Sequence, residues 1–134
     1  MQRFAPPSVF SVLASIVLLC SGSSIVFADD GDPAAGQKIF MKCQACHSVD
    51  AGTNKVGPSL HGLIGRHSAS ITTFNYSDAM KNANVTWDPP TLDKYLTNPR
   101  AMVPGTKMLF PGLPKPADRA NVIAYLKQAA GSAQ

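Results

Sequence analysis

The stretch Cys43-Gln44-Ala45-Cys46-His47 decides what kind of fold this chain can form. Two cysteines separated by two residues and followed at once by a histidine form the C-x-x-C-H pattern of covalent c-type haem attachment. The two thiols add to the two vinyl groups of a haem, and the histidine then directs its imidazole at the iron. The motif therefore predicts one haem c, bound through Cys43 and Cys46 and ligated by His47.

Three other uses of these cysteines have to be weighed against haem. Together with His61 and His67 they satisfy the loose spacing of a Cys₂His₂ zinc site. A zinc finger needs both histidines on one helix, however, and two glycines lie between them. A thiol–disulfide active site lies where a strand meets a helix, whereas the segment before Cys43 is expected to be helical. The third alternative is a chance pair of cysteines beside an ordinary histidine.

Residues 1–28 are predicted to be a secretory signal peptide. Arg3 supplies positive charge, a mainly apolar core follows, and Ala28 offers a small residue at the cleavage site. The small and polar residues 21–24 argue against a retained anchor, because a membrane span needs about 20 mainly apolar residues. A lipoprotein anchor at Cys20 would need small residues before it, and two leucines stand there. We therefore expect export to a bacterial periplasm, with no membrane insertion after cleavage.

Residues 29–134 are predicted to form one small domain. The whole chain has 12 Lys+Arg against 8 Asp+Glu and a formal net charge of +4. This excess is too small for the dense basic stripe of a nucleic-acid-binding protein, so no nucleic-acid partner is expected. It suits weak docking on acidic protein surfaces. Beyond residue 28 the cysteines are Cys43 and Cys46 alone, so the sequence predicts no disulfide framework.

Capping residues and apolar spacing predict an all-α fold of about four to five helices. The clearest helical segments are 32–43, 77–82, 88–98 and 116–130. The last of them carries an apolar stripe, made of Val122, Ile123, Tyr125, Leu126 and Ala129. Residues 48–76 and 103–116 are rich in glycine and proline and are expected to form loops. Loops of this length are unusual in so small a domain, but they can wrap around one covalent haem.

The group on the second face of the iron separates the possible functions. An open face would suit gas binding or peroxide chemistry, whereas a methionine thioether would close it and raise the reduction potential. Met41 lies too close to His47 to cross the ring, and Met80 and Met102 are expected to fill the core beside helices. Met108 instead lies in a loop of prolines and glycines, which can hold a long side chain against a metal.

With these features together, the sequence resembles the class I c-type cytochromes, the group of mitochondrial cytochrome c and bacterial cytochrome c2. The likeness covers essentially all of residues 29–134. The segments that carry it are 43–47, 57–66, 74–79, 86–87, 95–99 and 123–126. The resemblance implies a cytochrome c fold and a monomeric carrier of single electrons between membrane or periplasmic redox complexes. It implies no enzymatic activity.

The resemblance also implies roles for individual residues around the iron. His47 and Met108 would be the two axial ligands. The carbonyl of Pro58 would accept a hydrogen bond from the imidazole of His47, which orients the ring. The hydroxyl of Tyr95 would donate toward the sulfur of Met108 and so tune the reduction potential.

A second set of implied residues surrounds a haem propionate. Tyr76 and Trp87 would donate hydrogen bonds to the propionate, and Arg66 would balance its charge. A buried tryptophan N–H or tyrosine O–H needs a partner, which is consistent with this role. The alternative for Trp87 is an ordinary core aromatic. Gly36 would allow the first and last helices to cross closely.

Two features differ from the mitochondrial members of the group. Met80 stands where those proteins usually carry an asparagine that organises a buried water, so we expect a drier pocket and an altered potential. Lysines are also fewer around the haem edge. The candidate docking charges that remain are Lys42, Lys55, Arg100, Lys107 and Lys115, for which the alternative is ordinary solvated surface.

Two other functions stay open at this level. A labile Met108 would give an enzyme-like or sensory haem protein in which a small molecule takes the place of the methionine. An uncleaved signal would give a tethered subunit of an oxidase or dehydrogenase complex.

Overall fold

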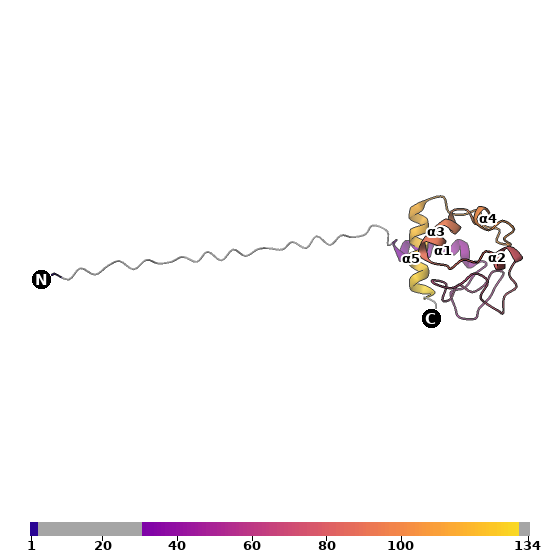
Figure 1. Cartoon of the computed structure of the whole chain (residues 1–134), viewed down its shortest axis with the longest axis horizontal. Helices are drawn as coiled ribbons and strands as arrows, with labels where there is room; N and C mark the ends of the chain where they lie inside the picture. Colours follow the sequence, from indigo (N-terminus) through magenta and orange to yellow (C-terminus); the bar gives the residue numbers. More distant parts are fainter. Residues whose placement is uncertain (3–30, 132–134) are drawn as a thin grey trace.

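The computed structural model describes residues 1–2 and 31–131, so the predicted signal peptide lies outside the described residues except for its first two. The described part of the chain contains five helices (Figure 1): α1 Pro33–Gln44, α2 Asp78–Asn82, α3 Pro89–Thr97, α4 Pro99–Met102 and α5 Pro116–Ala129. His67 and Thr86 form an isolated antiparallel bridge, and no strand occurs between residues 31 and 131. The prediction of an all-α fold with about four to five helices is confirmed.

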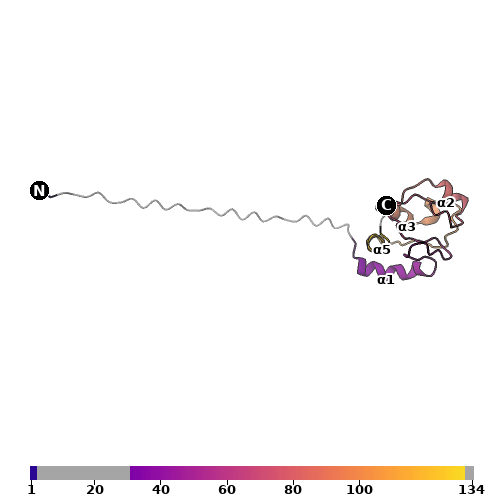
Figure 2. The ribbon, with the colours of Figure 1, turned by 90° about the horizontal axis from the view of Figure 1, so that it is seen from below.

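The first and last helices cross at close range, and Figure 2 shows α1 lying across α5, which is seen end-on. The backbone N–H of Asp32 donates to the side chain of Asn121 over 2.8 Å, which fixes the start of α1 on α5. A Cβ added at Gly36 would run into the carbonyl of Asn121 and lie 2.8 Å from the Cβ of Tyr125. Further along, the rings of Phe40 and Tyr125 lie 5.1 Å apart. Glycine therefore permits this approach, as the sequence predicts.

The helices α2, α3 and α4 each begin after a residue whose side chain accepts a hydrogen bond from the backbone. Ser77 caps α2 and Asp88 caps α3, each accepting from a backbone N–H of the first turn. Asn98 ends α3 in an extended conformation, and its side chain caps α4. Proline at the first position of a helix costs no hydrogen bond, and α1, α3, α4 and α5 all begin with one. The loops predicted at 48–76 and 103–116 contain no helix except at their last residue, Pro116, where α5 begins.

A single core joins α1, α3 and α5 to the loops. It consists of Phe40, Leu63, Trp87, Leu92, Tyr95, Val103, Leu113, Val122, Ile123, Leu126 and Ala130. The prediction for α5 is wrong at one position, since Ala129 is exposed and Ala130 is buried. At about 100° per residue, Ala130 lies within the arc that Ile123 and Leu126 define, and Ala129 lies about 60° outside it. Among the helices of residues 31–131, none combines the length and apolar character needed to cross a membrane.

Candidate functional site

The attachment segment is a turn that continues from the C-terminal end of α1. The backbone N–H groups of Cys46 and His47 both donate to the carbonyl of Cys43, over 3.0 and 2.9 Å. Both cysteines are free thiols, Cys43 half-buried and Cys46 exposed. Burial raises the pKa of the Cys43 thiol. The turn thus places two free thiols and an imidazole within five residues of one another.

The ring of His47 is held in one orientation by the loop that follows. Its Nδ1 lies 2.7 Å from the carbonyl oxygen of Pro58. A carbonyl can only accept, so the proton lies on Nδ1 and the lone pair of Nε2 remains available to a metal. The ring also packs on Gly57, where an added Cβ would lie 2.7 Å from Nδ1 and 2.8 Å from Nε2. The backbone N–H of Gly57 donates to the carbonyl of Cys46 over 2.7 Å and ties this loop to the motif.

The surroundings of His47 also favour its neutral form. Burial lowers the pKa of the imidazole, and the positive charges of Arg66 and Lys55 lower it further. The hydrogen bond to Pro58 acts in the opposite direction but is smaller than the effect of burial. A neutral imidazole is the form that ligates a metal. The protein therefore supplies His47 in the required protonation state and orientation.

Met108 lies in an irregular loop between α4 and α5, beneath the hydroxyl of a buried tyrosine. The backbone N–H of Met108 donates to Oγ1 of Thr106 over 3.3 Å, and the N–H of Thr106 donates to Val103. Tyr95 projects from α3, and its hydroxyl lies 3.9 Å from the sulfur of Met108. Burial raises the pKa of Tyr95, partly offset by a hydrogen bond with Thr106. The tyrosine therefore stays protonated and able to donate toward the sulfur.

The residues expected around a propionate, Arg66, Tyr76 and Trp87, lie near one another. The backbones of Arg66 and Trp87 are paired, with the N–H of Trp87 donating to the carbonyl of Arg66 over 2.9 Å. The ring of Trp87 lies 4.9 Å from that of Tyr95, which links these residues to Met108. Burial raises the pKa of Tyr76, and the nearby charge of Arg66 opposes that change. The structure thus brings Arg66, Tyr76 and Trp87 into one neighbourhood.

Arg66 carries an unmet hydrogen-bond donor that fits a haem propionate. Its Nη1 donates to the carbonyl of His61 and its Nη2 to that of Ser59, over 2.6 and 2.9 Å. Its Nε is buried and has no partner among the described residues. A buried guanidinium N–H without an acceptor is costly, and a carboxylate is its strongest partner. The residues present therefore fit a haem, which brings such a carboxylate to a site that already offers His47 and Met108.

The zinc alternative has no geometric support. Nδ1 of His61 lies 3.3 Å from the carbonyl of Val49, and Nδ1 of His67 lies 3.2 Å from that of Ser68. Within residues 31–131, no three or more histidine, cysteine, aspartate or glutamate side chains are grouped as a metal site requires. The two histidines therefore belong to the loops and not to a shared centre with the cysteines.

The candidate docking residues are all exposed, but the charged group of one of them is hydrogen-bonded within the molecule. Lys42, Arg100, Lys107 and Lys115 are exposed. Lys55 is also exposed, but its Nζ donates to the carbonyl of Gln44 over 2.8 Å. This places a cation at the C-terminal end of α1, where the helix dipole favours it.

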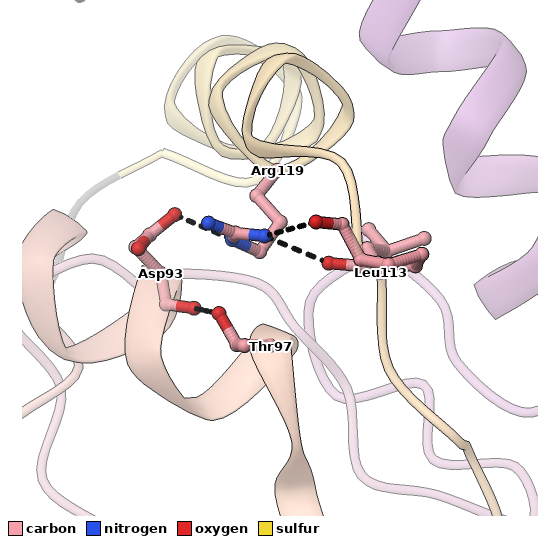
Figure 3. Close-up of polar contacts among 5 residues, drawn as sticks. Asp93, Thr97, Leu113 and Arg119 are labelled. Carbon is pink, nitrogen blue, oxygen red and sulfur yellow. Dashed lines mark hydrogen bonds and ion pairs between the residues drawn. The ribbon is translucent and has the colours of Figure 1, made fainter.

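Sequence reasoning missed one arginine that acts on the Met108 loop. Arg119 is 8% exposed and lies inside the molecule between α5, α3 and the end of the loop (Figure 3). A signal for it was available in the sequence, since Arg119 precedes Val122 and Ile123 by three and four residues. That spacing places it on the buried face of the last helix.

Comparisons with known proteins cover almost all of the described part of the chain. The cytochrome c family model matches residues 33–130. The chain is 56% identical over 99 residues to cytochrome c2 of Rhodoblastus acidophilus, covering 73% of this chain and 92% of that protein. It is 47% identical over 122 residues to cytochrome c-554 of Methylosinus trichosporium, covering 90% and 91%. It is 54% identical over 104 residues to cytochrome c of Ginkgo biloba, covering 76% and 92%.

Proposed function

Because the chain belongs to the cytochrome c family, we propose that it transfers electrons through an iron closed by His47 and Met108. Members of this family carry a covalently attached haem c, and Cys43 and Cys46 form its attachment motif in this chain. When bound, the haem supplies the one-electron Fe(III)/Fe(II) couple. With His47 and Met108 both bound, the iron would have no free position for a substrate, so we propose a carrier and not an enzyme.

The observation that carries this proposal is the position of Met108 under Tyr95. The hydroxyl lies 3.9 Å from the sulfur, so it can donate to one lone pair while the other would remain available to a metal. Met80 and Met102, by contrast, lie in α2 and α4 and pack against the core. A thioether ligand raises the reduction potential. Hydrogen bonding by Tyr95 is expected to adjust the potential further.

Other residues orient and shield the group. Pro58 holds His47 in one tautomer, so the ligand needs no reorientation when the oxidation state changes. Arg66, Tyr76 and Trp87 are proposed to hold a propionate. The burial of Trp87 and Tyr95 keeps water from this side of the site. A site that changes little between two oxidation states suits repeated electron transfer.

We further propose that the mature protein is periplasmic and acts as a monomer that docks weakly on redox partners. Cytochrome c2 relatives of bacterial origin support the first part. Exposed cations support the second, with Lys42, Lys55, Arg100, Lys107 and Lys115 as candidates. Long side chains on a solvated surface contribute little individually, so such docking is transient and sensitive to salt.

An optical spectrum of the ferric holoprotein tests the closed iron. Methionine ligation of Fe(III) gives a weak far-red band, which we expect in the wild type and expect to disappear in Met108→Ala. Met102→Leu is the matched control, because Met102 packs in α4 and its loss should leave the band in place. A wild-type spectrum without the band would contradict the proposal and favour a labile sixth position.

A further inference from the structure

A buried arginine joins three parts of the molecule at the downstream end of the Met108 loop. Nε of Arg119 donates to Oδ1 of Asp93 on α3 over 2.7 Å. Nη1 donates to two successive carbonyls of the loop, those of Leu113 and Pro114, over 2.9 and 3.1 Å (Figure 3). Buried guanidinium groups must have their donors satisfied. One side chain on α5 therefore holds both α3 and the loop.

These two carbonyls belong to a segment that is also fixed from the side of α3. The N–H of Leu113 donates to the carbonyl of Leu96 over 2.7 Å, and Leu113 is 3% exposed. Gly112, with φ +105°, lies so close to the carbonyl of Thr97 that a Cβ could not fit. The loop is thus anchored at residues 112–114 by α3 on one side and Arg119 on the other.

A second anchor lies upstream of Met108. The N–H of Val103 donates to the carbonyl of Pro99, and the N–H of Thr106 donates to that of Val103, over 2.9 and 3.0 Å. Val103 is 2% exposed. Between the two anchors, residues 107, 109 and 111 are exposed, and Leu109 is 83% exposed. The short span 107–111 therefore alternates exposed residues with Met108 and Phe110, which pack against the core.

Asp93 determines the direction in which Arg119 can donate. The guanidinium is planar and rigid, so fixing Nε fixes Nη1 as well. The side chain of Asp93 is 46% exposed, and the pair therefore contributes little through charge alone. Its main effect is orientation. The backbone carbonyl of Asp93 also accepts from Oγ1 of Thr97 over 2.8 Å, within the helix that provides the Leu96 anchor.

We propose that Arg119, oriented by Asp93, is a positioning residue that sets how readily Met108 leaves the iron. This inference rests on the proposed axial role of Met108. Arg119 reaches the loop five and six residues beyond Met108 and so acts through the loop backbone. Without it, the downstream end of the loop keeps the contacts of Gly112 and Leu113 with α3 but loses its hydrogen bonds to α5, so opening requires fewer hydrogen bonds to break.

The test measures the detachment of Met108 in the ferric holoprotein. Imidazole in large excess takes the position that Met108 leaves. The limiting rate at which the far-red band disappears therefore equals the rate of Met108 detachment. We expect Arg119→Lys to raise this rate about ten-fold, equivalent to ~1.4 kcal/mol, because the fork to two carbonyls is lost. We expect Asp93→Asn to raise it roughly three-fold, since neutral hydrogen bonds are about half as strong as charged ones. The double variant should be no faster than Arg119→Lys alone.

A matched control separates loop positioning from general stability. Phe40→Leu weakens the packing between α1 and α5 away from the loop, so it should lower the denaturation midpoint and leave the detachment rate unchanged. A wild-type rate in Arg119→Lys, even with a lower midpoint, would overturn the proposal. If Arg119→Lys does not fold, Asp93→Asn decides alone, because its half-exposed carboxylate tolerates an amide. A wild-type protein that lacks the far-red band overturns the proposed function instead.

Discussion

At the scale of single residues, neighbours decide what each side chain of the site can do. His47 is an ordinary imidazole until the carbonyl of Pro58 accepts a hydrogen bond from its Nδ1–H and burial lowers its pKa, which together leave Nε2 unprotonated and available. The resemblance implies only that Arg66 lies near a propionate, whereas the structure buries its Nε with no partner among the described residues. In both cases the useful atom is the one that the protein leaves unsatisfied.

Met80 shows how one apolar residue can set the polarity of the pocket. It lies in α2, is half-buried and packs against the core. An amide at this position would bring dipoles into the site, and polar groups stabilise Fe(III) more than Fe(II). We expect Met80→Asn to lower the reduction potential on the order of 20–60 mV, where 59 mV is a ten-fold change for one electron. A redox titration followed by absorbance measures this shift.

The matched control for that change is Met80→Leu, which keeps the position apolar. Its potential should stay near that of the wild type. An unchanged potential in Met80→Asn, with an equally stable Met108 loop, would show that the polarity at this position is immaterial.

At the scale of elements, the crossing of α1 and α5 depends on a residue without a side chain. Helix propensity alone favours alanine over glycine by about 1 kcal/mol. At Gly36, however, a methyl group would run into the backbone carbonyl of Asn121, which cannot move as a flexible side chain can. The steric term therefore outweighs the propensity term.

We expect Gly36→Ala to reduce the free energy of unfolding by about 1–3 kcal/mol, the usual cost of overpacking. Denaturant unfolding of the holoprotein, followed by far-ultraviolet circular dichroism, measures the change. Gln37→Ala is the control, since Gln37 is exposed on the same helix and a surface substitution should stay within about 0.5 kcal/mol. A stabilised Gly36→Ala would mean that the two helices can separate without loss.

The helices were predictable because their signals are local. Asp32, Ser77 and Asp88 each accept from a backbone N–H of the first turn, and each was recognisable beside a proline or an apolar pattern. Asn98 was recognisable only as the end of the segment 88–98, and the short helix α4 that it caps was not predicted. The paths of the loops were not predictable in the same way. Gly112 and Leu113 are fixed by carbonyls of α3, and neither contact has a signature in the neighbouring sequence.

At the scale of the whole molecule, the charge and exposure of surface residues determine how the protein docks on its partners. The net charge of +4 is modest, so the placement of each cation matters more than the total. Lys107 is exposed directly beside Met108, next to the exposed apolar Leu109. The positive charge of Lys107 should therefore attract an anionic oxidant that approaches this loop.

Oxidation of the ferrous holoprotein by ferricyanide tests this expectation. At low ionic strength we expect Lys107→Glu to slow the reaction about three- to ten-fold, within the usual range of electrostatic steering. Lys94→Glu, on α3 and outside the candidate docking set, changes the net charge equally and should slow it less. Near 1 M salt the screening length is about 3 Å, so the variants should converge. Equal effects of the two substitutions would show that only net charge matters.

The sequence by itself determined the cofactor class, the helices and the family, because these depend on local spacing. A C-x-x-C-H motif, a capping residue or a stripe at helical spacing acts within a few residues of the chain. Tertiary structure alone decided which groups meet, such as the carbonyl that orients His47 and the hydroxyl over Met108. It also left Nε of Arg66 buried with no partner within the described part of the chain. It also decided that Arg119 on α5 holds a loop that begins sixteen residues earlier, at Val103. Such contacts arise only when distant segments pack together, and burial then makes each hydrogen bond matter.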